Sequence, residues 1–169
     1  MNNEFILKYR VLIAIVAIGL RVTAALRTAG LSPSFIDLTK NDEDMNPRLI
    51  NLSALCHVLL IYPSDLFHPN LDKANTKRVP HSPRPELRDF SIIEEDYSKA
   101  FLDVLDKDKF VNAFRYDTYY CLTGMRTWKK RSPTILNAKN YLALMNMTLY
   151  EFFLHVEKIA WERIRKVKG

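Results

Sequence analysis

In this 169-residue sequence, the side chains best suited to binding an anionic ligand lie in one short stretch of basic residues. It places four basic residues around one tryptophan, just before Ser132 and Pro133: Arg126, Trp128, Lys129, Lys130 and Arg131. Lysine and arginine can neutralise phosphate groups, and tryptophan can pack against a sugar or anchor the loop. We therefore expect this stretch to contact phosphate, with a solvated basic loop as the alternative.

The charge balance of the whole chain favours the same kind of ligand without deciding it. Lysine and arginine number 25 against 19 aspartates and glutamates, which gives a net charge of +6. This balance leans toward anionic partners, but it is smaller than the excess of a histone-like protein.

Patterns for catalysis and metal binding are missing from the sequence. His57, His68, His81 and His155 have no metal-ligand spacing with one another or with the two cysteines. No phosphate-binding glycine loop, nucleophile elbow or metalloprotease motif occurs. We expect neither an enzyme nor a site for a metal or other cofactor.

Composition and cysteine use are those of a globular protein of one or two small domains. A hydrophobic share of 48% excludes fibrous and wholly disordered classes. Cys56 and Cys121 lie in apolar stretches, which indicates buried, reduced thiols and a cytoplasmic protein. The apolar run Val11–Leu20 is shorter than the roughly 20 residues that span a membrane, so no membrane is expected. We predict a core helix over 4–18 that is covered on all sides, with a signal peptide as the alternative.

An internal repeat is the most informative feature of the chain. Residues 47–67 and 133–153 each run for 21 residues from a proline to a phenylalanine, and apolar residues coincide along both. The spacing predicts a helix that begins at the proline and a second helix after it, with Thr148 and Glu151 at capping-box spacing. The alternative is that amphipathic helical hairpins resemble one another by chance.

Four prolines between the repeats divide the chain. They predict an extended linker over 68–92, a first unit over 1–67 and a second unit over 93–169. The second unit is expected to end in a long amphipathic helix over 149–168, which could bridge the two units or form a dimer.

A helix, a glycine turn and a second capped helix precede the first repeat. Gly30 permits a tight turn, Ser32 can cap the next helix, and Pro33 suits its first position. With Ala29-Gly30-Leu31-Ser32-Pro33, Asn46-Pro47 and Ser64-Asp65-Leu66-Phe67, residues 4–67 resemble the Cro/repressor-type (xenobiotic-response-element) helix-turn-helix family. A weaker second copy over 95–153 resembles the same family. The resemblance implies an all-α fold of two tandem, divergent five-helix units like those of lambda repressor.

The resemblance also implies a sequence-specific transcriptional regulator that binds double-stranded DNA. Short polar side chains of the recognition helices would meet base edges, and the basic stretch would meet phosphates. Besides Arg126, Trp128, Lys129, Lys130 and Arg131, the candidate DNA-binding residues are Ser32, Ser34, Thr39, Lys40, Tyr116, Asp117 and Thr118. Whether Phe35 or Ile36 anchors the first recognition helix in the core stays open.

Acidic residues around the first recognition helix support a different hypothesis. Asp42, Glu43 and Asp44 follow that helix and would repel phosphate. The alternative is therefore a protein-interaction module that captures another regulator through the acidic loop Asp42–Asp44 and does not bind DNA. A homodimer through the apolar first helix or the C-terminal helix is a further expected partner contact.

Overall fold

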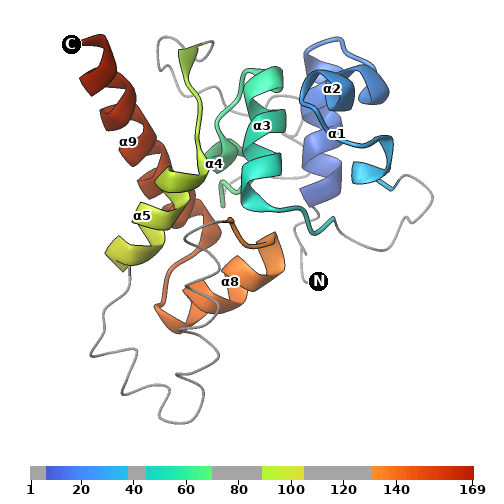
Figure 1. The fold of residues 1–169 in the computed structure, drawn as a ribbon. Coiled ribbons are helices and arrows are strands. Elements are labelled where there is room, and N and C mark those ends of the chain that lie inside the picture. The colour runs from blue at the N-terminus through green and yellow to red at the C-terminus, as the bar shows by residue number, and fades with distance from the viewer. Residues whose placement is uncertain (1–6, 38–44, 70–88, 105–130) are drawn as a thin grey trace.

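The computed structural model describes residues 7–37, 45–69, 89–104 and 131–169, and within these ranges every regular element is a helix. The all-α prediction is confirmed for this part of the chain. Figure 1 shows α1 and α2 on one side, α5 and α9 on the other, and α3 between them. The elements are α1 Leu7–Ala17, α2 Val22–Thr28, the 3-10 helix η1 Pro33–Phe35, α3 Leu49–Leu59, α4 Pro63–Leu66, α5 Glu94–Val104, α8 Ile135–Leu144 and α9 Leu149–Lys168.

The predicted N-terminal helix forms as α1, but one chain does not cover it on all sides. Its inner face packs against α2 and α4, and Val11 and Ile15 are fully buried. Val16 is 72% exposed and Tyr9 46%, so the expectation that the rest of this chain encloses the helix is wrong. That a second subunit covers the exposed face of α1 stays a prediction.

Membrane crossing was tested on the described helices. None of them is alone both long and apolar enough to cross a membrane. The pair α1 and α2 reaches the required length and composition together, but the chain bends by 93° between them.

One hydrophobic core joins the two halves of the chain. It combines Leu26, Leu52 and Leu55 from the N-terminal half with Phe101 and Phe152 from the C-terminal half. The part of the chain that the structure describes therefore does not divide into two separate cores on either side of 70–88. The burial of large aromatic and aliphatic side chains in this shared core provides the main drive for the two halves to fold together.

The long C-terminal helix α9 forms over the predicted range and bridges the halves. Its N-terminus carries the predicted capping box: the Thr148 backbone N–H donates to Glu151 Oε2 at 2.8 Å, and Glu151 N–H donates to Thr148 Oγ1 at 3.2 Å. Its buried face packs against α5 and α8, and also against α4 of the N-terminal half. Bridging, one of the two expected roles, is confirmed; dimer formation is untested.

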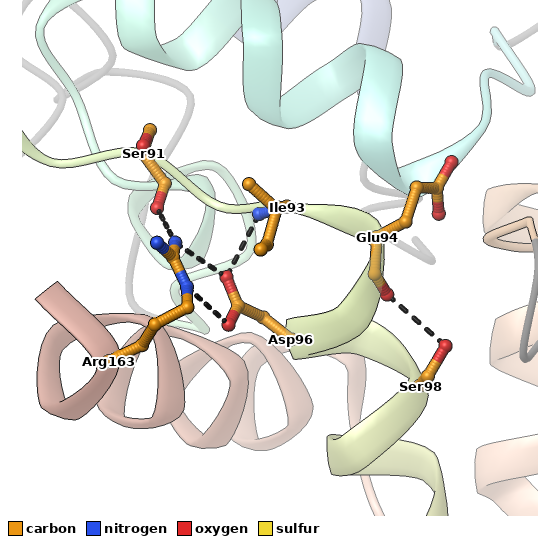
Figure 2. A network of polar contacts seen from close by, with 6 residues as sticks. All are labelled: Ser91, Ile93, Glu94, Asp96, Ser98 and Arg163. Atoms are coloured by element: carbon orange, nitrogen blue, oxygen red, sulfur yellow. Dashed lines mark hydrogen bonds and ion pairs between the residues drawn. The ribbon is translucent and has the colours of Figure 1, made fainter.

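An ion pair holds α9 against α5 (Figure 2). Arg163 donates from Nε to Asp96 Oδ1 and from Nη2 to Oδ2, both at 2.9 Å, and Nη2 also reaches the Ser91 carbonyl at 2.7 Å. Asp96 in addition accepts from the Ile93 backbone N–H at 2.9 Å, which caps α5. Because Asp96 is 2% exposed, these bonds replace the water that its carboxylate gives up on folding.

A buried polar layer joins α3 to α5 and α4 to α9. Tyr97 Oη pairs with Ser53 Oγ and with the Leu49 carbonyl, and Glu157 Oε1 accepts from the hydroxyl of Ser64 at 2.8 Å.

Burial, with the charges of Glu157 and Asp65 as smaller causes, raises the pKa of the Cys56 thiol well above its usual range. Cys56 is a free, buried thiol, as its apolar surroundings predicted, and it stays protonated and unreactive near neutral pH.

The sequence repeat is also a repeat of backbone geometry. Each proline is followed by a helix, α3 or α8, and each helix ends near a residue with a left-handed backbone at the equivalent position: Leu60 with φ 55° and Asn146 with φ 53°. The next helices, α4 and α9, begin at equivalent positions too. The left-handed positions and the starts of both helix pairs are separated by the same 86 residues as Pro47 and Pro133, so the repeat extends from the sequence to the backbone.

The equivalence extends to the helix that precedes each repeat. In the N-terminal half α1 packs on α4, and in the C-terminal half α5 packs on α9, the counterpart of α4. The two helices bury residues with the same spacing: Val11, Ala14 and Ile15 in α1, and Tyr97, Ala100 and Phe101 in α5.

Candidate nucleic-acid interface

A tight turn joins α2 to η1 at Gly30, where the sequence predicted one. Ala29 caps α2, and Gly30 follows with φ +72°. A Cβ on Gly30 would meet nothing within 4 Å, so it is the backbone conformation that requires glycine there. The Leu31 N–H then donates to the Leu26 carbonyl at 2.8 Å, which closes the turn and brings the chain to Ser32.

Ser32 caps η1 as expected, and this helix covers three residues, Pro33–Phe35. Ser32 Oγ accepts from the Ser34 backbone N–H at 3.2 Å and lies 2.7 Å from Ser34 Oγ, and both serines are exposed. The 3-10 helix ends at Phe35, and Ile36 is extended, with φ −114° and ψ 108°. The helical conformation that begins at Pro33 therefore does not continue through Ile36.

Burial decides which residue anchors this segment. Ile36 is 3% exposed and belongs to the shared core, whereas Phe35 is only partly buried. An extended backbone at Ile36 turns its side chain inward, and this inward turn ends the 3-10 helix. Ser32 and Ser34 are left on the outside, which suits residues that meet a ligand.

Two backbone hydrogen bonds join the starts of the two repeats. The Leu49 N–H donates to the Pro133 carbonyl at 3.0 Å, and the Ile135 N–H donates to the Pro47 carbonyl at 2.9 Å. They form an isolated antiparallel bridge between Arg48 and Thr134. Leu49 is equivalent to Ile135 in the repeat, and Pro47 is equivalent to Pro133. The two hydrogen bonds therefore join equivalent atoms in opposite directions.

The following backbone amide of each helix donates to a side chain of the opposite repeat, so these two hydrogen bonds are reciprocal as well. The Ile50 N–H donates to Ser132 Oγ at 3.1 Å, and the Leu136 N–H donates to Asn46 Oδ1 at 2.9 Å. Ser132 and Asn46 each precede the proline of their own repeat. The first amides of a helix have no partner within it, and here the opposite repeat supplies their partners.

Equivalent residues also meet at the other end of the repeats. The rings of Phe67 and Phe153 stack with centroids 5.0 Å apart and planes 12° from parallel. When a residue contacts its own counterpart, it lies on the symmetry axis that relates the two copies. The Arg48–Thr134 bridge and this stack therefore mark an approximate two-fold axis within one chain. We call its Arg48–Thr134 end the bridge end.

A cavity of about 420 Å³ opens at the bridge end. Its walls come from α1, η1, α3 and the residue before α8, and they include Lys8, Ser34, Asp37, Arg48, Asn51 and Thr134. Arg48 reaches the Ser132 carbonyl at 3.4 Å, and Lys8 is only 4% exposed. Arg48 is partly exposed and lies among neutral polar groups, so this wall can offer one cation and several hydrogen-bonding groups to a ligand.

The structure describes three of the residues predicted to bind DNA. Ser32 and Ser34 lie on η1, Arg131 lies beside Ser132, and all three are exposed. The remaining predicted residues lie outside the described residues: Thr39, Lys40, Tyr116, Asp117, Thr118, Arg126, Trp128, Lys129 and Lys130. The acidic loop Asp42–Asp44 lies outside them too.

Sequence reasoning did not single out Lys8, Arg48 or Asn51 as part of this surface. A signal for Asn51 was present, because Asn51 and Asn137 are identical at equivalent positions of the repeats. No comparable pattern marks Lys8, which stands in an apolar helix and reaches the site only through the fold.

Comparisons with known proteins return no match for this chain among family models, curated proteins or solved structures. Across residues 7–37, 45–69, 89–104 and 131–169, no three histidine, cysteine or acidic side chains gather in a way that could hold a metal ion.

Proposed function

We propose that this protein is a sequence-specific DNA-binding transcriptional regulator of the helix-turn-helix type. The observation that carries the proposal is the turn from α2 through Gly30 into the Ser32-capped η1. This turn fixes the second helical element against the core through Ile36 and leaves its hydroxyls outside. Exposed short polar side chains on such an element can reach base edges in the major groove.

The charges near η1 support a polyanionic ligand. Arg48 lies in the same cavity as Ser34, and Arg131 is exposed beside Ser132, which belongs to the bridge contact. Contacts from such cations to phosphates supply much of the affinity of DNA-binding proteins and make it depend on salt. The net charge of +6 acts in the same direction at longer range.

A second candidate function has an observation in its favour. The helical part of η1 covers only three residues, and Asp37, which follows it, is exposed. A short turn with an acid beside it offers less to a major groove than a full helix does. A protein-interaction module that captures another regulator through the N-terminal half is the function that this observation favours.

Binding of fluorescent duplex DNA at several salt concentrations tests the first proposal. We expect salt-sensitive binding by the full chain, and a variant with Lys129, Lys130 and Arg131 changed to alanine should lose up to about 0.9 of the logarithmic salt slope per phosphate contact removed. The matched control changes three exposed lysines of α9 to alanine, with the same loss of charge: Lys158, Lys166 and Lys168.

The two triple variants distinguish a phosphate-binding stretch from a general effect of charge. A greater loss of affinity and slope in the Lys129–Arg131 variant than in the α9 variant supports the proposal. Equal losses refute the assignment of the basic stretch. No binding to any duplex at low salt refutes DNA binding and favours the interaction module.

A further inference from the structure

The contacts between the repeats are those of a symmetric dimer, made within one chain. Four hydrogen bonds form two reciprocal pairs, and Phe67 stacks on its own counterpart Phe153. In a two-fold homodimer the same patch on both subunits makes such self-complementary contacts. Here both patches belong to the same chain, and each patch is covered by the other.

The surface around Ser132 is enclosed, so it is not open to a second chain. Ser132 is 1% exposed, Leu49 is fully buried and Pro133 is buried. A second copy therefore cannot use this patch to build a symmetric pair unless the chain first opens. The molecule already contains the partner that a single unit would otherwise have to recruit.

Of the elements proposed to meet DNA, η1 lies at one end of the internal axis. Ser34 of η1 shares the cavity with Arg48, Asn51 and Thr134, two of which form the bridge on the axis. Asn51 and its counterpart Asn137 both lie in the first turn after the bridge and are accessible, Asn137 more so. The bridge end thus carries equivalent positions on both sides of the axis.

Duplex DNA has its own local two-fold axes, and two-fold proteins bind it with the axes aligned so that each half meets one half-site. We infer that one chain, without a second copy, presents both halves of an approximately two-fold DNA-binding surface and takes a duplex that contains two half-sites. This inference rests on the proposed function.

The two half-sites should differ in sequence, because the two sides of the axis differ in chemistry. Arg48 faces Thr134 across the bridge, and both residues are partly exposed. Side chains of different charge and hydrogen-bonding capacity prefer different bases and local shapes. The preferred duplex is therefore an imperfect inverted repeat.

Selection from a random duplex pool, followed by native mass spectrometry and hydroxyl-radical footprinting, tests the inference on the full chain. We expect one 19.7 kDa chain per duplex at saturation. The footprint should show two protected patches, one on each side of a local two-fold axis of the duplex.

Two matched variants connect each half of the protein to its half-site. Asn51→Ala should relax selection in one patch and Asn137→Ala in the other, each with roughly a tenfold loss of affinity for the selected duplex. Circular dichroism and the melting temperature check that both variants fold. Each variant also serves as the control for the other, since the substitution is the same.

The possible outcomes distinguish failure of the two-half-site inference from failure of the proposed DNA-binding function. Two chains per duplex, or one chain that protects a single patch, overturns the inference while DNA binding stands. Variants that relax the same patch also overturn it. Failure of the pool to yield any bound duplex refutes the proposed function, and the inference with it.

Discussion

Replacement of Ser132 by alanine tests whether the two repeats cap each other. Ser132 Oγ accepts from the Ile50 N–H at 3.1 Å, although the two residues are 82 positions apart in sequence. The backbone N–H of Ser132, which donates to Glu94 Oε2 at 2.6 Å, is retained in alanine. The substitution therefore removes the cap of α3 and leaves the two backbone hydrogen bonds of Ser132, to Glu94 and Arg48, in place.

The size of the effect follows from the burial of the cap. Loss of a serine cap costs about 1 kcal/mol, within a range of about 0.5–2. Ser132 is 1% exposed, so water cannot easily replace its oxygen, and we expect a loss of about 1–2 kcal/mol in the free energy of unfolding. One kcal/mol corresponds to about a fivefold faster exchange of an amide that opens with the affected turn.

Urea unfolding and amide hydrogen exchange by NMR measure this prediction. Ser132→Ala should accelerate exchange of the Ile50 amide and the first turn of α3, in the opposite half of the chain. The counterpart variant Asn46→Ala should act on the first turn of α8, with a smaller loss because Asn46 is exposed. Faster exchange only near residue 132, with an unchanged Ile50 amide, would refute the reciprocal capping.

Three further predictions follow from the contacts of α9. Arg163→Met should lower the free energy of unfolding in urea by about 2 kcal/mol, because it leaves the Asp96 carboxylate buried; partial exposure of Arg163 keeps the loss below the roughly 3–5 kcal/mol of a fully buried pair. Phe153→Ala should cost about 3–5 kcal/mol in the same assay, since the ring is fully buried, and an unchanged midpoint would contradict its place in the core. Hydrogen bonds from Thr148 lower the pKa of Glu151, so this carboxylate stabilises the fold above its unfolded-state pKa and the contribution disappears as pH falls through the lower folded-state value. Melting temperatures measured across the acidic range should therefore fall less steeply for Thr148→Ala than for the parent chain.

Local sequence signals predicted the helices and the repeat with good accuracy. Backbone sterics and capping preferences predicted the turn and the helix start at Gly30, Ser32 and Pro33. A spacing of three residues predicted the capping box of Thr148 and Glu151. The length of η1 was not predicted by these signals. Burial of Ile36 in an extended conformation ends it early, and that depends on a core formed by distant residues.

The relation between the two halves could not be predicted from these local signals. Two tandem units were expected, and no local signal indicated that they share one core or that each repeat caps the other. The partner of the Leu136 amide is Asn46, 90 residues away, and no local pattern identifies such a pair. Likewise Lys8 appeared to be one charge in an apolar helix, and only the packing of α1 beside η1 and α3 brings it to the cavity.

The central claim is that DNA meets the bridge end with both halves of one chain, and an NMR titration of the labelled protein with its selected duplex tests it most directly. The account predicts that amide shifts at equimolar DNA concentrate at the bridge end in both halves: at Ser32, Ser34 and Asn51, and at Arg131 and Asn137. Val167, at the exposed end of α9, should stay unchanged. Shifts confined to α9, or to one half alone at saturation, would contradict the claim.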